Sequence, residues 1–272
     1  MGRRDGQRIE GLPGVRRIMP FLMPTRTESL VFFEQEIQIG ATLRWLEANP
    51  ELRFFHLVLA ALVRTLAERP QLNRFTRGGR LYQREHIELS FAVKKRLSDE
   101  ASMTMMKVRF EPGDALAQIV ERVEDAVRAG RAAEPTGSER EMGLVLRLPG
   151  FCLRALMRVQ RWLDAWGLLP YALVRGDPLY ASVVVANLGS VGIDAAYHHL
   201  YEYGNAPLFA TIGRIERRPI VDEEGALAVG EVVRLRYSFD ERITDGFYCA
   251  RSLERLERYL RDPEQLREAR PG

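Results

Sequence analysis

Apolar residues alternate with polar ones in some stretches of the chain and recur every three to four residues in others, which predicts strands and helices respectively. Strands are expected over 30–39, 86–95, 102–110, 181–186, 208–215 and 233–239. Helices are expected over 41–48, 51–69, 114–129, 146–166 and 247–256. With 272 residues, the chain can hold one large domain or two small ones with an ample core.

The last predicted strand and the last predicted helix are joined by a short polar turn, D-E-R-I-T-D-G, at residues 240–246. Asp245 is a candidate N-cap for the helix, and Gly246 gives the backbone freedom for a sharp turn. Tight turns at strand ends often expose reactive side chains, so we expect the candidate site here.

Composition excludes several classes of function. Lys and Arg number 40 against 37 Asp and Glu, and they are mixed along the chain, so no nucleic-acid partner is expected. Cys152 and Cys249 lack C-x-x-C spacing, which predicts neither a metal site nor a disulfide and fits a reducing cytoplasm. No apolar run suits a signal peptide or approaches the ~20 residues of a membrane span, so we expect a cytoplasmic protein.

The predicted helix over 146–166 carries Arg154, Arg158 and Arg161 on one side, with leucines and two tryptophans as its bulk. A basic amphipathic helix can lie on an anionic membrane. We favour the alternative, in which the helix covers part of a core and its arginines are solvated.

Several phrases of the sequence occur in the same order in one known family. They are Pro70-Gln71-Leu72-Asn73, Asn187-Leu188-Gly189-Ser190, Gly213 with Ile215, Arg218-Pro219, and, in the turn, Asp240, Arg242, Asp245 and Gly246. Together they resemble the catalytic core of the acyltransferases of 2-oxoacid dehydrogenase complexes and its relative, chloramphenicol acetyltransferase. In that family the turn usually has the sequence D-H-R-x-x-D-G. The resemblance covers about residues 30–260.

The resemblance implies an α/β (α+β) fold, a chloramphenicol acetyltransferase-like two-layer sandwich with a mixed, mostly antiparallel sheet and helices on one face. We expect an N-terminal arm over 1–28, a catalytic domain over 29–262 with an inserted helical segment at about 134–180, and a tail over 263–272. It also implies a homotrimer with sites between subunits. Since no lipoyl or subunit-binding module is found, we expect a stand-alone domain that builds no large cage.

The activity implied is transfer of an acyl group from acyl-CoA to a thiol or hydroxyl of a small or carrier-borne acceptor. CoA is then a substrate, and neither a tightly bound cofactor nor a metal is expected. In the family a histidine takes the proton of the acceptor, and a Ser or Thr hydroxyl donates to the oxyanion. The Asp of the Asp-Gly pair, here Asp245 before Gly246, is structural and pairs with an arginine, for which Arg16, Arg17 and Arg26 are candidates.

The sequence departs from the family at both catalytic positions, with Glu241 in place of the histidine and Ala186 in place of the hydroxyl residue. A carboxylate with a reference pKa of ~4.3 is a weak base toward a thiol. We therefore expect His198 or His199 to supply the imidazole, with Glu241 orienting it. The alternative is that both histidines only anchor a loop.

The turn with Asn187, Gly189 and Ser190 borders the family's active-site channel. Ser190 is a candidate oxyanion donor, or simply a turn-forming residue. Two functions follow from the resemblance: an acyltransferase with a rearranged base, in which Arg242, Asp245 and Gly246 shape the site, or a catalytically inactive trimeric scaffold that binds acyl-CoA.

Overall fold

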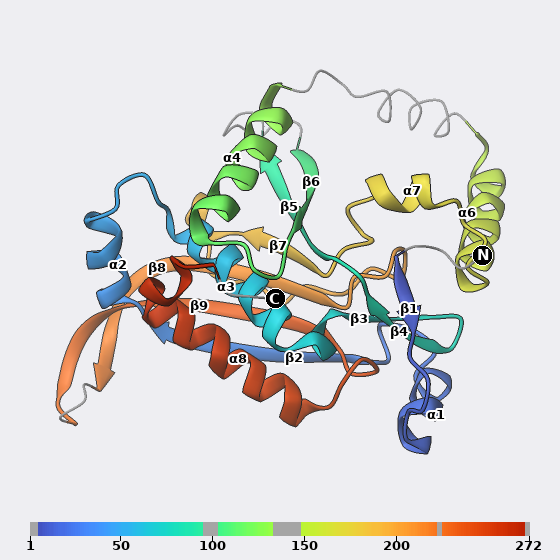
Figure 1. Ribbon diagram of the computed structural model, residues 1–272, viewed down its shortest axis with the longest axis horizontal. Helices are drawn as coiled ribbons and strands as arrows, with labels where there is room; N and C mark the ends of the chain where they lie inside the picture. Colours follow the sequence, from blue (N-terminus) through green and yellow to red (C-terminus); the bar gives the residue numbers. More distant parts are fainter. Residues whose placement is uncertain (1–4, 95–102, 133–147, 222–224, 270–272) are drawn as a thin grey trace.

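A computed structural model describes residues 5–94, 103–132, 148–221 and 225–269 (Figure 1). Its centre is a mixed six-stranded sheet in the order β2-β9-β8-β7-β5-β6. The strands are β2 (Leu30–Gln38), β5 (Ile87–Lys94), β6 (Met103–Phe110), β7 (Val183–Asn187), β8 (Leu208–Val221) and β9 (Leu227–Asp240). The β8–β7 and β7–β5 pairs are parallel and the others antiparallel. A mixed, mostly antiparallel sheet was predicted, and this is confirmed.

Helices cover one face of this sheet (Figure 1). They are α3 (Phe54–Glu68), α4 (Leu116–Ala132) and α8 (Gly246–Arg261), with the shorter α2 (Gly40–Glu47) packed on α8 at the edge. Alternation along β9 builds the core, because Leu235, Tyr237 and Phe239 are buried under the helices. The two-layer sandwich predicted from the sequence is therefore confirmed.

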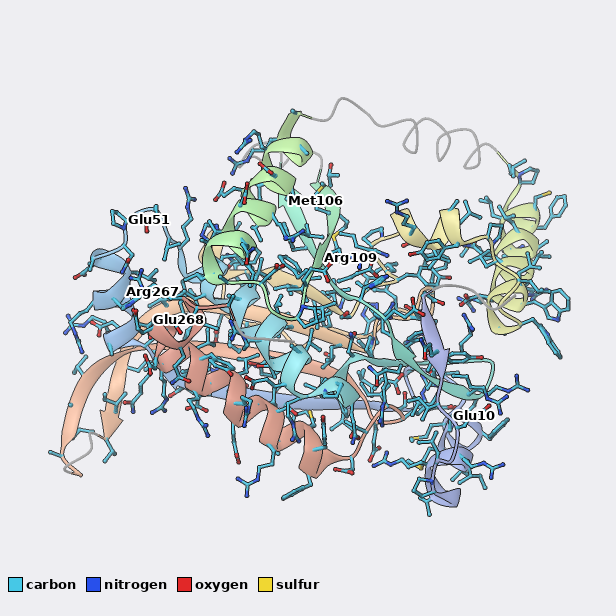
Figure 2. All side chains as sticks on the ribbon, viewed as in Figure 1. Glu10, Glu51, Met106, Arg109, Arg267 and Glu268 are labelled. Carbon is cyan, nitrogen blue, oxygen red and sulfur yellow. The ribbon has the colours of Figure 1, made fainter. Side chains whose placement is uncertain are left out.

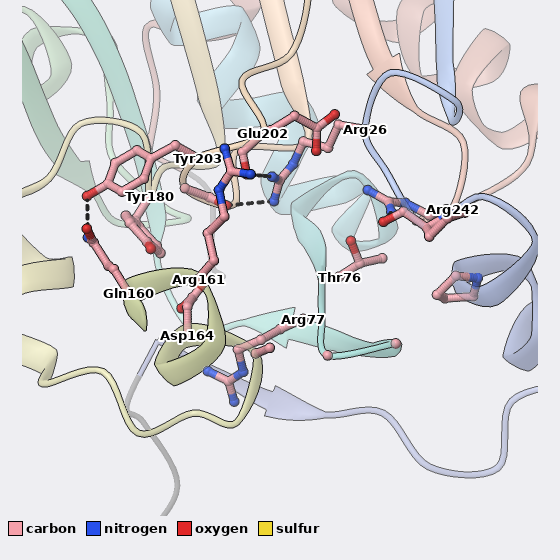
Figure 3. Close-up of a pocket in the computed structure, with 16 residues that line it drawn as sticks. Arg26, Thr76, Arg77, Gln160, Arg161, Asp164, Tyr180, Glu202, Tyr203 and Arg242 are labelled. Atoms are coloured by element: carbon pink, nitrogen blue, oxygen red, sulfur yellow. Dashed lines mark hydrogen bonds between the residues drawn. The ribbon is translucent and has the colours of Figure 1, made fainter. Parts of the chain in front are cut away.

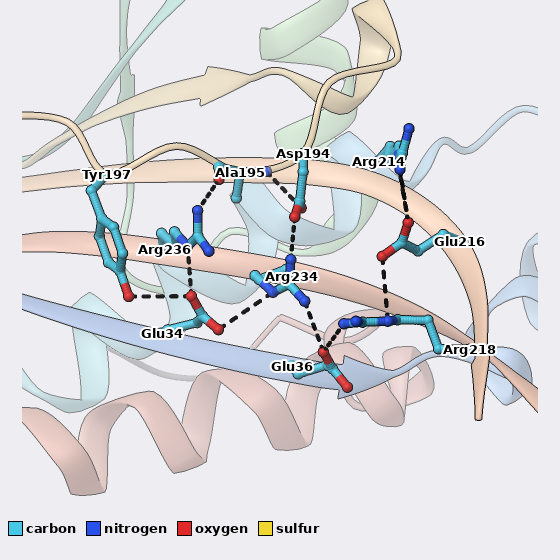
Figure 4. A network of polar contacts seen from close by, with 10 residues as sticks. All are labelled: Glu34, Glu36, Asp194, Ala195, Tyr197, Arg214, Glu216, Arg218, Arg234 and Arg236. Carbon is cyan, nitrogen blue, oxygen red and sulfur yellow. Dashed lines mark hydrogen bonds and ion pairs between the residues drawn. The ribbon is translucent and has the colours of Figure 1, made fainter. Parts of the chain in front are cut away.

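The opposite face of the sheet carries charged side chains across β2, β9 and β8 (Figure 4). Arg234 contacts Glu34, Glu36 and Asp194, and Arg236 Nε donates to Glu34 Oε2 at 2.6 Å. That hydrogen bond is the main cause of a lowered pKa of the Glu34 carboxyl. Cross-strand ion pairs hold this part of the face, and a small apolar cluster that includes Val184, Leu200 and Phe209 packs beside them.

A second, three-stranded sheet in the order β1-β4-β3 lies beside the first, with β1 (Gly6–Arg8), β3 (Arg74–Arg77) and β4 (Arg80–Arg84). The β3–β4 hairpin turns at Gly78 and Gly79, whose φ angles of 54° and 71° favour glycine. This hairpin was predicted and is confirmed. The first 28 residues are not simply extended, because after β1 they form the helix α1 (Gly14–Leu22).

The described part of the predicted insertion contains α6 (Gly150–Ala165) and α7 (Tyr171–Gly176); residues 134–147 lie outside the described residues. No residue of α6 is fully buried, but Leu163 packs on the small apolar cluster of Leu169, Val174 and Tyr180. The helix therefore covers part of a minor core, while most of its apolar residues stay exposed. Short 3-10 helices complete the fold as η1 (Pro70–Asn73), η2 (Gly189–Val191) and η3 (Pro263–Leu266). Across the described ranges, no helix combines the length and the apolar character needed to cross a membrane.

Candidate active site

A buried ion pair holds the turn between β9 and α8. Asp240 is 1% exposed and Arg242 is 4% exposed. Arg242 Nε and Nη2 donate to the two Asp240 carboxylate oxygens, both at 2.8 Å, in the bidentate geometry that makes such pairs strong. Arg242 Nη1 also donates to the carbonyls of Met23 and Pro24. The pair therefore fixes the turn and ties it to the segment after α1.

Asp245 caps α8, as predicted. Its Oδ1 accepts a hydrogen bond from the Tyr248 backbone N–H at 2.7 Å, which satisfies one of the free donors of the first helical turn. Its Oδ2 lies 3.3 Å from Arg16 Nη2. The expected arginine partner is thus Arg16 of α1, and Gly246 begins the helix at an exposed position.

Glu241 is held in the turn by its backbone. Its N–H donates to the Ser29 carbonyl at 2.9 Å, and its carbonyl accepts from Arg16 Nη1 at 3.3 Å. Its side chain is half-buried. Within the described ranges no hydrogen bond joins its carboxylate to His198 or His199, so an orienting role for Glu241 stays a prediction.

The two histidines form an aromatic stack on the sheet face that the helices leave open. The His198 ring lies 3.9 Å from the Phe209 ring and nearly parallel to it, and the His199 ring stacks on His198 at 4.7 Å. His198 Nδ1 is 2.7 Å from the His199 carbonyl oxygen, and the His198 carbonyl accepts from the Ser238 hydroxyl. His198 is half-buried and His199 exposed, so the two imidazoles are not equivalent.

The turn after β7 is closed by its own polar groups. Asn187 Oδ1 accepts from the Ser190 N–H at 3.2 Å, and Ser190 Oγ donates to the Asn187 carbonyl at 2.7 Å. This is the turn-forming arrangement of the serine, and its role as an oxyanion donor stays a prediction. Gly189 packs directly against the backbone of Gly213 in β8.

Alanine in place of Gly189 is expected to destabilise the protein by about 1–3 kcal/mol, because its Cβ would overlap the Gly213 carbonyl oxygen, and two backbones cannot separate cheaply. Urea-induced unfolding followed by circular dichroism measures the change. Gly150→Ala is the matched control, since nothing lies within 4 Å of its Cβ position. Equal stability of both variants would contradict the close approach.

The strand position that holds a hydroxyl residue in the family is Ala186 here, half-buried in a small apolar cluster. Its cross-strand neighbour on β8 is Thr211, whose hydroxyl donates to the Ala196 carbonyl at 2.7 Å. The nearby hydroxyl is thereby already engaged. Neither Ala186 nor Thr211 therefore offers a free hydroxyl that could donate to the oxyanion in place of the family's Ser or Thr.

A cavity of about 230 Å³ opens beside the turn, between α1, the β3–β4 hairpin, α6 and the loop 202–204 (Figure 3). Of the turn, only Arg242 lines it; Glu241 and the two histidines do not. Arg26 forms part of its wall and donates to the carbonyls of Tyr201, Glu202 and Gly204. Burial is the main cause of a lowered Arg26 pKa.

Sequence reasoning missed the polar contacts that join α6 to this wall. The Tyr203 hydroxyl donates to Asp177 Oδ2 and accepts from Gln160 Nε2 at 2.9 Å. Burial, followed by the Asp177 carboxylate, raises the pKa of Tyr203 well above its usual value. Because Gln160 and Tyr203 lie 43 positions apart, no local pattern indicated this contact.

Residues 177–267 match the model of the 2-oxoacid dehydrogenases acyltransferase (catalytic domain) family. The last third of the chain is thus similar to these acyltransferase domains. It is 25% identical over 209 residues to the lipoamide acyltransferase component of the branched-chain alpha-keto acid dehydrogenase complex of Bacillus subtilis (strain 168). That match covers 77% of this chain and 39% of the relative, so the chain spans about two fifths of the relative's length.

Solved structures confirm the fold. A probable dihydrolipoamide acetyltransferase from Listeria monocytogenes 4b F2365 aligns over 98% of both chains with a TM-score of 0.60 and 16% identity. The cubic core of the pyruvate dehydrogenase multienzyme complex aligns with a TM-score of 0.61 and 16% identity, over 95% of this chain and 93% of the other. A chloramphenicol acetyltransferase gives 0.58 at 13% identity, over 94% and 99%. The acyltransferase-like fold inferred from the sequence is therefore correct.

Proposed function

We propose that the protein is a CoA-dependent acyltransferase that moves an acyl group from acyl-CoA to a thiol or hydroxyl acceptor, with His198 as its general base. The contact that carries this choice is the 2.7 Å approach of His198 Nδ1 to a carbonyl oxygen. A carbonyl only accepts, so Nδ1 carries the proton, and in the neutral ring Nε2 keeps its lone pair. Within the described residues, no hydrogen bond from a ring nitrogen of the exposed His199 fixes the tautomer of that imidazole.

In the proposed reaction, His198 Nε2 takes the proton of the acceptor thiol or hydroxyl while the sulfur or oxygen attacks the thioester carbonyl carbon. The carbon–sulfur bond to CoA breaks as the tetrahedral intermediate collapses, and the imidazolium returns the proton to the leaving CoA thiolate. General-base help of this kind contributes about 10²–10⁴ in rate. The stacked Phe209 ring would hold the imidazole in place during both transfers.

We also propose that the protein works as a trimer, as the relationship to acyltransferase cores suggests. His198 lies on the sheet face opposite α3, α4 and α8, where the exposed rings of Phe32 and Tyr197 also contact each other. A neighbouring subunit placed on this face would enclose the imidazole and exclude water from the reaction.

The proposal is tested by separating and quantifying the free CoA formed from acetyl-CoA, with dihydrolipoamide as the first acceptor and a longer acyl-CoA as the second donor, because transfer to a thiol leaves the total number of free thiols unchanged. CoA release that requires both enzyme and acceptor is expected. Release no faster than without enzyme, for both donors, would contradict the proposal.

The second candidate function is an inactive scaffold that binds acyl-CoA. It is favoured by Glu241 and Ala186 at the two catalytic positions, and by the engaged hydroxyls of Ser190 and Thr211. Under this hypothesis the wild type binds CoA without turnover, and the double variant Glu241→His with Ala186→Ser gains activity. If the wild type turns over acyl-CoA and the double substitution lowers that activity, the scaffold hypothesis is excluded.

A further inference from the structure

Helix α6 presents an apolar stripe that nothing in the described structure covers. The stripe consists of Phe151, Val159, Trp162 and Trp166, which are between 53% and 69% exposed. Their spacing places them on one sector of the helix. Figure 2 shows the side chains of α6 projecting outward from this end of the molecule.

A row of arginines borders the stripe. Arg154, Arg158 and Arg161 are all exposed and follow each other at intervals of four and three residues, which aligns them along the helix. The remaining sector faces the protein, where Leu153 and Leu163 are half-buried and Gln160 bonds to Tyr203. The helix thus has separate packed, basic and exposed apolar sectors.

Helix α1 repeats the pattern at the same end of the molecule (Figure 1). Its exposed apolar residues are Val15, Ile18, Phe21 and Leu22, of which Val15 is 72% and Phe21 is 68% exposed. The hairpin tip joins the two helices. A Cβ on Gly78 would meet the Ala165 carbonyl of α6, and one on Gly79 would lie 2.8 Å from the Phe21 ring of α1. The two stripes therefore flank one hairpin, and we call them together the α1–α6 face.

Charge on the two helices is one-sided. They contain five arginines, of which Arg16 is paired with Asp245 and the other four are exposed, and a single carboxylate, Asp164, which is half-buried in the wall of the cavity. Arg80 on the hairpin is also exposed, while Glu10, before α1, is an exposed acid nearby. A face that combines exposed aromatic side chains with excess positive charge is complementary to a surface that is both apolar and anionic.

We propose that the α1–α6 face docks on an anionic lipid bilayer, with the aromatic stripe in the headgroup region and the arginines at the phosphates. Tryptophan suits this depth because its ring is apolar and its N–H is polar. Arginine can bury its stem and keep its charged end among the headgroups. A second copy of the chain on this face would bring like-charged arginine rows together, which costs free energy.

A bilayer also accounts for the repetition of the pattern on two helices from distant parts of the sequence. A fluid surface needs no complementary shape, which a folded protein partner would have to supply. The cavity beside the turn is lined by residues of the same elements, including Pro20 of α1 and Arg161 of α6. Docking would place that cavity next to the lipid headgroups.

Co-sedimentation of the full chain with vesicles tests the proposal without any assay of activity. Phosphatidylglycerol and phosphatidylcholine in equal amounts provide the anionic surface, and pure phosphatidylcholine the neutral one. Binding to the anionic vesicles is expected to weaken about tenfold on the neutral vesicles, and also as salt rises toward 1 M.

The variant Phe151→Ser with Trp162→Ser and Trp166→Ser is expected to lose about tenfold or more of the binding. The matched control changes three exposed apolar residues of the β8–β9 hairpin at the other end of the molecule, Val221→Ser with Leu227→Ser and Val229→Ser. Thermal unfolding checks that both variants are folded.

Tryptophan fluorescence gives an independent signal. The chain has three tryptophans, and Trp45 hydrogen-bonds to Glu264 away from this face. In the Trp45→Phe variant, a blue shift of the emission on adding anionic vesicles reports the α6 pair entering the lipid.

Three results would overturn the proposal: no binding of the wild type to anionic vesicles at low salt, equal binding of the α6 variant, or no blue shift in Trp45→Phe. If the α6 variant instead changes the mass of the lipid-free protein, the face is a contact between copies or with another protein.

Discussion

Replacement of Arg242 with alanine is expected to lower the free energy of unfolding by about 3–5 kcal/mol, the largest loss we predict for a single substitution. The variant leaves the Asp240 carboxylate, 1% exposed, without the two donors that lie 2.8 Å from its oxygens. It also removes the donor to the carbonyls of Met23 and Pro24. Urea-induced unfolding of purified protein measures the difference.

An exposed arginine provides the control. Arg251 pairs with Glu254 at 2.8 Å on the surface of α8, where both side chains are more than half exposed. Arg251→Ala is expected to cost about 0.5 kcal/mol or less, since solvent screens such pairs. A second variant, Asp240→Leu with Arg242→Met, removes both charges and is expected to recover much of the loss. A loss below about 1 kcal/mol for Arg242→Ala would show that the pair does not hold the turn.

Replacement of His198 with alanine is expected to lower kcat for acyl transfer by about 10²–10⁴, the contribution of a general base. KM for acyl-CoA should change little, because the ring acts on the proton of the acceptor and not on CoA binding. Steady-state kinetics with acetyl-CoA and a thiol acceptor separate the two constants. The substitution also removes the packing of the imidazole on the Phe209 ring. Circular dichroism therefore checks that the His198→Ala variant keeps the native fold.

His199→Ala and His198→Gln complete the comparison. His199 is exposed and stacks only on neighbouring rings, so its loss should leave kcat within a few-fold of the wild type. The His198→Gln variant keeps a polar side chain of similar reach without a titratable base and should be as slow as alanine. A large loss in His199→Ala with activity retained in His198→Ala would reverse the assignment.

The turn at the end of β9 shows how far local sequence signals extend. The Asp245 cap, the helix that follows it and the hairpin at Gly78-Gly79 were all predicted, because each depends on residues next to it in the chain. The sequence left three candidates for the arginine partner of Asp245. Arg16 is identified only by the fold, which brings α1 against the start of α8. The cavity wall was not predicted, since its contacts join residues from distant segments.

Helix α6 shows where pattern analysis fails. Its periodicity correctly predicted an amphipathic helix, yet of its apolar side only the part around Leu163 packs on a core cluster, and the two tryptophans stay exposed. Periodicity records that one side differs from another but does not say whether the apolar side meets protein, lipid or another copy. The contacts of Leu153 and Leu163, which are half-buried while the tryptophans are exposed, decide which sector packs.

The central claim, that this chain transfers acyl groups with His198 as the base, is tested most directly by mass spectrometry of the acceptor. Wild-type protein incubated with acetyl-CoA and the thiol acceptor is expected to form acetylated acceptor and free CoA in equal amounts, and His198→Ala is expected to form neither above background. Absence of acetylated acceptor with the wild type, or equal formation by His198→Ala, would contradict the account.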